Sequence, residues 1–171
     1  TYTATVAGDG SWTTTVPAAD LSALRDGDAT VQASVSNING NTASATHAYS
    51  VDATAPTLAI NTIATDDILN AAEAGNPLTI SGTSTAEAGQ TVTVTLNGVA
   101  YIGTVQAGGS WSVSVPTADL SNLTASPYTV SASVSDKAGN PASATHGLAV
   151  DLTVPVLTIN TVSGDDIINA T

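Results

Sequence analysis

The feature that most limits the fold of this chain is an internal repeat. The stretch GDGSWTTTVPAADLSAL, which contains Trp12, returns as AGGSWSVSVPTADLSNL, which contains Trp111, so the offset is 111 − 12 = 99 residues. When the sequence is aligned with itself at this offset, no gap is needed from Tyr2 to the end of the chain, and about half of the aligned positions are identical. Each copy must therefore be one structural unit that recurs along the chain.

The offset divides the sequence into three parts. We predict that residues 1–52 are the C-terminal part of a first repeat, residues 53–151 a complete repeat, and residues 152–171 the start of a third. The boundaries lie in SVDATAPTL and AVDLTVPVL, where Pro56 and Pro155 fix φ and favour an extended residue before them. Such short links favour a semi-rigid array of repeats. Because the pattern is already under way at Tyr2, we expect a piece of a longer protein.

Alternation of apolar and polar residues indicates strands throughout the complete repeat. Asn97-Gly98 is typical of a tight type I′ hairpin, and TADLSNL (residues 117–123) indicates one helical turn, with Asp119 as its expected cap and Asp20 as the cap of its counterpart. Seven short antiparallel strands predict an all-β fold, a Greek-key sandwich of the immunoglobulin type. The expected strands are residues 57–63, 77–84, 91–96, 100–105, 110–115, 128–135 and 142–150.

The charge balance narrows the range of partners. The formal net charge is −12, yet only 9% of residues are charged, and Arg25 and Lys137 are the two cationic side chains. Such a chain is poorly suited to nucleic acid or to anionic membranes, and divalent cations or basic partners are its natural counter-charges. The absence of cysteine excludes disulfides, thiolate metal sites and cysteine nucleophiles. No apolar run approaches the roughly 20 residues of a membrane span.

The acids fall in loops that the strand order places at the two ends of the sandwich. At the lower end, Asp66 and Asp67 follow the first strand and are expected beside Asp151, where the last strand leaves. Asn70 and Glu73 follow in the same loop, and we expect them to bond backbone and to face solvent. The pair Asp165 and Asp166 repeats Asp66 and Asp67 in the third copy.

At the upper end, Glu87 and Asp136 occupy two loops that should lie beside Asp52 in the incoming linker. Tandem repeats would therefore bring lower acids, a linker acid and the next repeat's upper acids together. Hard oxygen ligands in this number suit Ca²⁺, which takes six to eight oxygens in flexible geometry. We predict calcium sites between repeats that lock neighbouring repeats into a straight rod; the alternative for each acid is a turn cap or a solvated loop residue.

The complete pattern resembles a known family. The linker VDxTxP, the segment DDxxNAxEA, the strand GSWSVSVP and the loop SDKAGN are similar to the bacterial immunoglobulin-like repeats of giant secreted adhesins, the Bap-type and other type I-secreted surface proteins of biofilms. The resemblance covers the whole chain. It implies a sandwich fold, an extracellular location at the bacterial cell surface, calcium at repeat junctions, and a role in adhesion or biofilm formation. One departure is Asn37, which stands where the complete repeat has Asp136.

The resulting hypothesis is a stalk repeat whose partners are neighbouring repeats, with homotypic contacts or host ligands engaged elsewhere in the protein. The alternative is an immunoglobulin-like module that binds a glycan or host protein itself. We expect no enzyme, because His47 and His146 recur as a structural position without a positioned nucleophile. Trp12 and Trp111 alternate with valines, so we expect both in the core, and Tyr128 is a candidate tyrosine corner.

Overall fold

The computed structural model describes residues 1–124, 126–162 and 167–168. The chain separates into two compact units, Thr1–Ala55 (unit 1) and Pro56–Thr171 (unit 2). Unit 1 contains a four-residue helix and a long antiparallel hairpin. Its elements are α1 (Ala18–Leu21), β1 (Gly27–Ser36) and β2 (Thr42–Val51).

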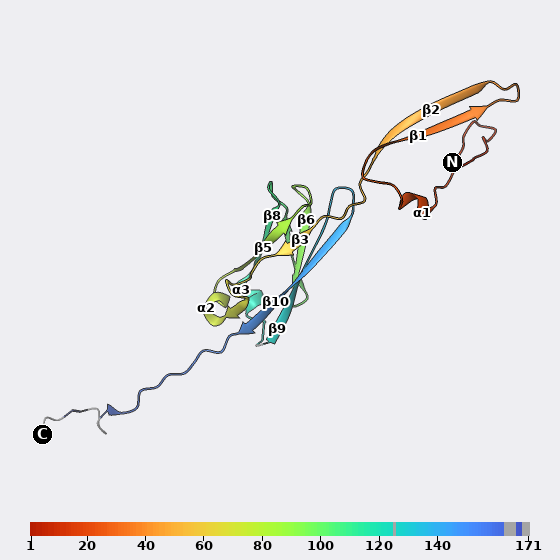
Figure 1. Cartoon of the computed structure of the whole chain (residues 1–171). Coiled ribbons are helices and arrows are strands. Elements are labelled where there is room, and N and C mark those ends of the chain that lie inside the picture. The colour runs from red at the N-terminus through yellow and green to blue at the C-terminus, as the bar shows by residue number, and fades with distance from the viewer. Residues whose placement is uncertain (125, 163–166, 169–171) are drawn as a thin grey trace. The chain divides into compact units, whose positions relative to one another are not determined.

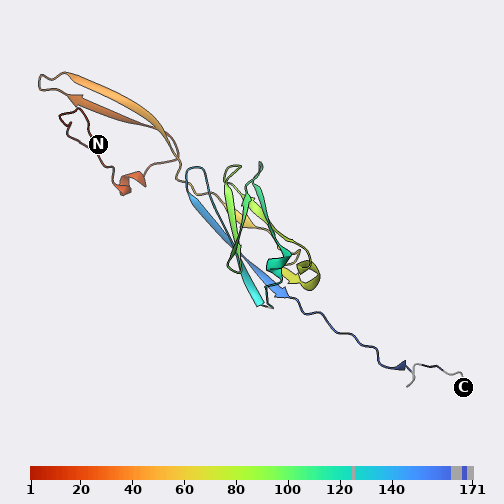
Figure 2. The same ribbon diagram turned by 180° about the vertical axis from the view of Figure 1, so that it is seen from behind.

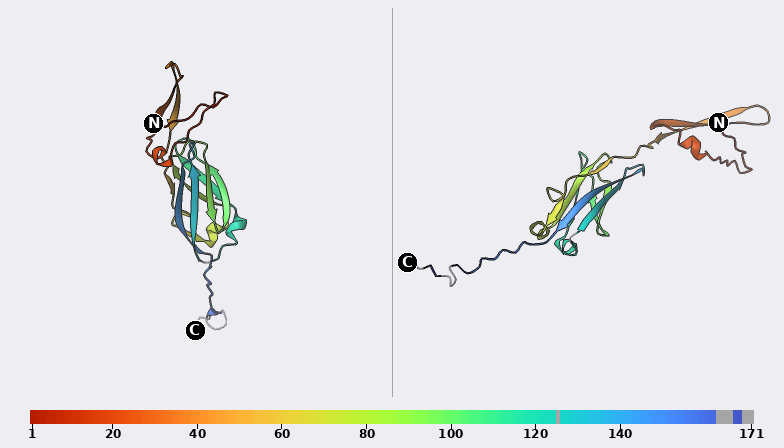
Figure 3. Two further views of the ribbon diagram at one scale, coloured as in Figure 1. Left: turned by 90° about the vertical axis from the view of Figure 1, so that its right-hand side faces the viewer. Right: turned by 60° about the horizontal axis from the view of Figure 1, so that its bottom comes forward.

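Unit 2 is a β-sandwich of two sheets that pack face to face (Figures 1 and 2). The three-stranded sheet has the order β3-β5-β8, and the five-stranded sheet has the order β4-β10-β9-β6-β7. Both views in Figure 3 show the two layers of unit 2. Its elements are β3 (Leu58–Ile60), β4 (Ile68–Asn70), α2 (Ala71–Ala74), β5 (Leu78–Ser84), β6 (Thr91–Leu96), β7 (Val99–Thr104), β8 (Ser110–Val115), α3 (Thr117–Leu120), β9 (Ser126–Ser135) and β10 (Pro141–Asp151).

The predicted all-β sandwich is confirmed, and alternation gives its core. Successive inward residues of β6 and β8 are buried while the threonines and serines between them are more exposed. Trp111 is 2% exposed and lies opposite Gly82 of β5. A side chain at Gly82 would overlap the indole ring, so glycine there makes room for the tryptophan. Asn97 and Gly98 both have positive φ, 50° and 78°, as a type I′ hairpin requires.

One strand was missed in the sequence. β4 pairs in parallel with β10, so the sandwich is not wholly antiparallel. The first strand ends at Ile60, and the chain then reverses through Ala64, Thr65 and Asp67, all with positive φ. This turn carries the chain from the three-stranded sheet to the edge of the five-stranded sheet. Three residues of strand are too short to display an alternating pattern.

The expected capping by Asp119 and Asp20 is wrong. Pro116 and Pro17 occupy the N-cap positions of α3 and α1, and neither helix has a side-chain cap among the described residues. The helical turn itself is confirmed, and Leu120 beneath it is fully buried.

The expectation that Trp12 lies in the core is also wrong. Trp12 is 54% exposed, although its counterpart Trp111 is buried. Trp111 is covered by β5, and an offset of 99 leaves no counterpart of β5 within residues 1–55. The alternation that predicted burial is therefore intact in unit 1, but the opposite sheet is not among its residues.

Candidate functional site

The lower end of the sandwich is formed where β4 runs beside the end of β10, with α2 and α3 at the same end (Figure 1). Asn70 lies opposite Asp151 in the parallel register. The Asp66 carboxylate accepts a hydrogen bond from the Ile68 N–H at 3.0 Å, and Asp151 accepts one from the Thr153 N–H at 3.0 Å. The loop that contains the predicted acids thus reaches the exit of the last strand through Asn70.

Asn70 and Glu73 have a local role that the sequence also encodes. The Asn70 side chain accepts from the N–H groups of Ala72 and Glu73, and the Glu73 carboxylate accepts from the Asn70 N–H at 3.1 Å. This reciprocal arrangement is a capping box, which starts α2. The spacing Asn-x-x-Glu before a short helix is the signal that identifies it. The expected backbone bonding of Asn70 is confirmed, whereas Glu73 is held by the box.

Asp67 makes the most contacts of the lower acids. Its Oδ1 accepts from the Ile63 N–H at 2.8 Å and lies 2.7 Å from Nε2 of His146 on β10. Its main-chain carbonyl accepts from the Ala149 N–H at 2.9 Å. The hydrogen bond from Ile63, and next the contact with His146, lower the pKa of Asp67 against the opposing effect of partial desolvation. Asp67 therefore connects the positive-φ turn to β10 by hydrogen bonds. His146 contributes to this structural contact, in line with the structural role predicted for it.

The upper end brings two of the predicted acids to neighbouring loops. Glu87, in the loop after β5, accepts from the Lys137 N–H at 2.9 Å. Lys137 follows Asp136 in the β9–β10 loop, so Glu87 is tied to the chain next to Asp136. This hydrogen bond spans 50 residues of sequence and could not be read from local spacing.

Asp136 is 8% exposed and shapes the β9–β10 loop. Its Oδ1 accepts from the N–H groups of Gly139 and Asn140, both at 2.8 Å, and its Oδ2 accepts from the Asn140 side chain at 2.9 Å. Burial raises the pKa of Asp136, but the hydrogen bonds, led by the Asn140 side chain, outweigh burial and leave that pKa below its usual value.

Unit 1 forms the equivalent loop, between β1 and β2, with an uncharged side chain in place of the Asp136 carboxylate. Asn37 occupies the position of Asp136, and its side-chain oxygen accepts from the N–H groups of Asn39 and Asn41 at 3.0 and 2.9 Å. The main-chain bonds that close the two loops also correspond, Asn37 with Asn41 and Asp136 with Asn140. An amide oxygen is therefore sufficient to build this turn, and the additional negative charge at residue 136 is not needed for its shape.

The linker acids adopt one arrangement in both units. The Asp52 carboxylate accepts from the Thr54 N–H at 3.3 Å, as Asp151 does from Thr153. Sequence reasoning missed Asp26, which accepts from the Ala53 N–H at 2.7 Å and from the Thr54 hydroxyl. At the offset of 99, its counterpart is Ala125, which lies outside the described residues, so the repeat gave no signal for this contact.

The carboxylate oxygens at both ends are of the kind that binds a hard cation. Every predicted ligand is a carboxylate, and calcium in proteins is bound by such oxygens. Within the described residues, no group of three or more His, Asp or Glu side chains is placed to hold a metal ion. A complete Ca²⁺ shell of six to eight oxygens is more than the described residues bring together at either end. Asp165 and Asp166 lie outside the described residues.

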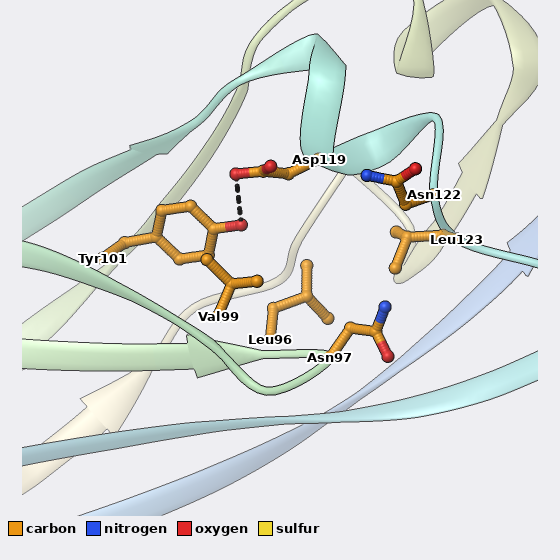
Figure 4. A pocket seen from close by; sticks show the side chains of 7 residues that line it. All are labelled: Leu96, Asn97, Val99, Tyr101, Asp119, Asn122 and Leu123. Atoms are coloured by element: carbon orange, nitrogen blue, oxygen red, sulfur yellow. Dashed lines mark hydrogen bonds between the residues drawn. The ribbon is translucent and has the colours of Figure 1, made fainter.

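A small pocket beside α3 contains a repeated tyrosine–aspartate pair. The pocket has a volume of about 80 Å³, and the Tyr101 hydroxyl donates to Asp119 at 2.9 Å across it (Figure 4). Burial, and next the hydrogen bond to Asp119, raise the pKa of Tyr101 to about 12. In unit 1, Tyr2 donates to Asp20 at 2.6 Å. Because the pocket volume accommodates only a few water molecules, we interpret this pair as a structural hydrogen bond that holds the helical turn α3 against β7.

Tyr128 makes the contact expected of a tyrosine corner. Its hydroxyl accepts from the Thr124 N–H at 3.0 Å, four residues upstream. The contact with the Thr124 hydroxyl, and next this main-chain bond, lower the pKa of Tyr128. The interaction fixes the crossing into β9 after the α3 turn.

Comparison with known families gives the identity of the fold. The model of the bacterial Ig-like domain matches residues 60–152. The chain belongs to the bacterial Ig-like domain family. The match covers most of unit 2. No curated protein matches the chain. Within the described residues, no helix is long and apolar enough to cross a membrane.

Solved structures similar to this Ig-like chain come from adhesins. A Ca²⁺-stabilized adhesin of an Antarctic bacterium that binds ice is 35% identical, with a TM-score of 0.52, over 94% of this chain. The chain spans only 40% of that protein's length. A bacterial immunoglobulin-like domain from the M. primoryensis ice-binding adhesin is 40% identical, with a TM-score of 0.45, over 58% of this chain and 100% of that one. A tetra-tandem repeat from the extending region of a large adhesion protein is 32% identical over 86% of this chain and 37% of that one, with a TM-score of 0.49.

Proposed function

We propose that this chain is a segment of the stalk of a bacterial surface adhesin, in which tandem Ig-like repeats form a calcium-stiffened rod for cell adhesion or biofilm formation. The observation that carries the proposal is the repeat of 99 residues, whose acids lie at both ends of the complete sandwich. The similarity to a Ca²⁺-stabilized adhesin over 94% of the chain supports it. Its place of action would be outside the cell, at the bacterial surface.

The proposed division is residues 1–52, 53–151 and 152–171, with a calcium junction at each boundary. The first junction would use one linker acid with the upper-end acids, and the second would use the other linker acid with the lower-end acids. The third copy's pair would begin the following junction. The proposed ligands are Asp52, Glu87 and Asp136 for the first, Asp66, Asp67 and Asp151 for the second, and Asp165 and Asp166 for the third.

The physical role of calcium would be to convert repulsion into cross-linking. Carboxylates about 4 Å apart repel by roughly 1–4 kcal/mol at the dielectric constants of water and of a protein surface. A bound Ca²⁺ attracts the carboxylates, so the net interaction between them becomes favourable. By coordinating oxygens from two repeats, it would also restrict rotation at the linker. Extracellular modules typically bind calcium with Kd of roughly 10⁻⁴ to 10⁻³ M. Such sites would be filled outside a cell and largely empty in the cytosol.

A calcium titration of stability tests the lower junction. At free calcium of 100 times Kd, linkage stabilises the folded state by about 2.7 kcal/mol. For a domain of this size we expect Tm to rise by about 10 °C. The double variant Asp66→Asn, Asp151→Asn should lose most of this rise. Asp9→Asn is the matched control, because Asp9 accepts from Ser11 within a turn of unit 1 and contacts no predicted ligand.

The quantity compared between the proteins is the change in Tm on adding calcium, not Tm itself. The wild-type chain and the Asp9→Asn control should respond alike, and the double variant should respond weakly. An equal response in all three proteins would reject the lower-end acids as ligands. No response in any of them would reject calcium stiffening altogether.

The alternative is an Ig-like module that binds a glycan or host protein directly. A shallow groove of about 610 Å³ crosses β6, β9 and β10, but its lining of mainly serine, threonine and other small residues includes no aromatic or ionisable side chain. Binding of the 171-residue chain to a glycan array would favour this alternative over a purely structural role.

A further inference from the structure

The two linkers differ at the position directly after the linker acid. Residues 51–56 (VDATAP) and residues 150–155 (VDLTVP) align at the offset of 99, and Ala53 stands where the second linker has Leu152. Leu152 is half-buried and packs against the hydrophobic core of unit 2. Its apolar contacts hold the start of the second linker on the sandwich. The single methyl group of Ala53 cannot replace a leucine side chain in this role.

Asp26 holds the start of the first linker instead. It stands directly before β1, whose first residue, Gly27, pairs with Val51 at the end of the hairpin. One carboxylate oxygen accepts from the Ala53 N–H at 2.7 Å, and the other accepts from the Thr54 hydroxyl. Hydrogen bonds to a charged carboxylate are stronger than those between neutral groups. The first linker is therefore fixed to unit 1 as far as Thr54.

The two attachments exchange residue types between the same pair of positions. Ala125 stands at the position of Asp26 and carries no carboxylate, and the linker that follows it has Leu152. Where the chain has Asp26, the linker has Ala53. Each repeat thus has one side chain that holds its linker, either a carboxylate before the strand or a leucine within the linker. This exchange is expected if both repeats need the attachment and two chemistries provide it.

The attached residues in turn orient the linker acids. The Asp52 carboxylate accepts from the Thr54 N–H at 3.3 Å, and the Asp151 carboxylate accepts from the Thr153 N–H at 3.0 Å. A bond from the N–H two residues further on fixes an aspartate side chain relative to the local backbone. Because Asp26 holds Thr54, it also sets where the Asp52 carboxylate lies. A side chain held in place before a ligand arrives loses less conformational entropy on binding.

We propose that Asp26 and Leu152 are positioning residues for the linker acids. Each fixes the start of its linker to the preceding repeat and so presents the linker acid, Asp52 or Asp151, before any cation binds. The attachment itself is independent of calcium. Its effect on calcium affinity rests on the proposed function, in which both linker acids are ligands. Removal of a group that orients a metal ligand typically lowers metal affinity about 10–100-fold.

Backbone order in the first linker, measured by ¹⁵N relaxation in EDTA, tests the attachment without calcium. In the wild-type chain we expect order parameters of about 0.85 at Ala53 and Thr54, the value of a rigid backbone. Asp26→Ala should lower both to below about 0.6. Asp26→Asn keeps an oxygen that accepts from the Ala53 N–H and should preserve most of the order. Asp28→Ala is the matched control, because it removes the same charge two residues further on and leaves both linker hydrogen bonds intact.

The second linker is tested in the same way. Leu152→Ala should lower the order parameter of Thr153 to below about 0.6, because the apolar contact with the core is lost. The matched control is Val154→Ala, which shortens a side chain of the same linker that is 68% exposed. Circular dichroism checks that the sandwich stays folded in both variants.

Calorimetric titration with calcium measures the effect on the linker acid of the first junction. Asp26→Ala should weaken binding about 10–100-fold. Asp26→Asn and Asp28→Ala should bind like the wild-type chain, because the first keeps the attachment and the second does not touch it.

The outcomes separate the proposal from its competitors. Loss of linker order in Asp26→Ala, with weaker calcium binding that Asp26→Asn does not share, supports it. Unchanged order at residues 53 and 54 in Asp26→Ala overturns the attachment, and lost order with wild-type calcium affinity overturns the positioning role. Kept order with weakened binding in Asp26→Asn would show that Asp26 is itself a ligand, which also overturns that role. A wild-type chain that binds no calcium would refute the proposed function, whereas the order parameters would still decide the attachment.

Discussion

Gly82 gives the sharpest test of how the core of the sandwich is built. A Cβ at this position would lie 1.9 Å from the Ala59 carbonyl oxygen and 2.4 Å from Cζ2 of Trp111. The first of these atoms is backbone of the neighbouring strand β3, and the second belongs to a buried indole, so neither moves freely. Overpacking typically costs about 1–3 kcal/mol, and a backbone clash places Gly82→Ala at about 3 kcal/mol or more. We expect Tm to fall by about 12 °C or more.

The matched control is Gly147→Ala on β10. Nothing lies within 4 Å of a Cβ at Gly147, so this substitution should be neutral or stabilise by up to about 1 kcal/mol. Both variants are measured by denaturant unfolding in a Trp12→Phe background, in which Trp111 is the single tryptophan reporter. Unfolding free energies of the two variants within about 1 kcal/mol of each other would refute the assignment of Gly82 as the slot for the indole.

Three further predictions concern hydrogen bonds to side chains. The lowered pKa of Asp136 means that its stabilisation is present above the usual value of 3.8 and is lost as pH falls through the lower folded-state pKa. Asp136→Asn should reduce this acid-dependent loss in unfolding curves and change neutral-pH stability little, because Asn37 builds the same turn; a failure to fold would contradict this. The pKa of Tyr101, raised to about 12, predicts stability that is complete below pH 10 and falls as pH rises toward 12. Tyr101→Phe should remove this alkaline dependence, which unfolding at pH 9 and 11.5 measures, whereas an unchanged pH profile would exclude the buried Tyr101 hydroxyl as its cause. Asn70→Ala should cost about 1 kcal/mol in denaturant unfolding through loss of the capping box, and a cost near zero would show that α2 forms without it.

The strands could be predicted from the sequence because burial alternates cleanly along them. Val113 and Val115 of β8 are buried beside exposed serines, and the Asn97-Gly98 turn fixes the hairpin that follows β6. β4 could not be predicted, since three residues show no period and its pairing depends on β10, about 80 residues away in the sequence. The burial of Trp12 failed for a similar reason, because alternation identifies an inward face but not whether another sheet covers it.

The candidate site was predictable in position more than in detail. Strand order placed the loop that contains Asp66 at the end where β10 leaves, and in the structure Asn70 of that loop pairs with Asp151. It could not show that Asp67 contacts His146 or that Glu87 bonds the Lys137 N–H, because these contacts join distant loops. The capping role of Asn70 could have been recognised from its spacing to Glu73, since a capping box is local. The ligand assignments themselves remain predictions.

The most direct test of the central claim is small-angle X-ray scattering with and without calcium. Curves are recorded on the wild-type chain at low protein concentration, at millimolar calcium and after addition of EDTA. If calcium stiffens the linkers, the maximum dimension and the radius of gyration increase with calcium and return with EDTA. The double variant Asp66→Asn, Asp151→Asn should show a smaller change. Identical scattering curves with calcium and with EDTA, from a chain that remains folded in both, would contradict the proposed stiffened rod.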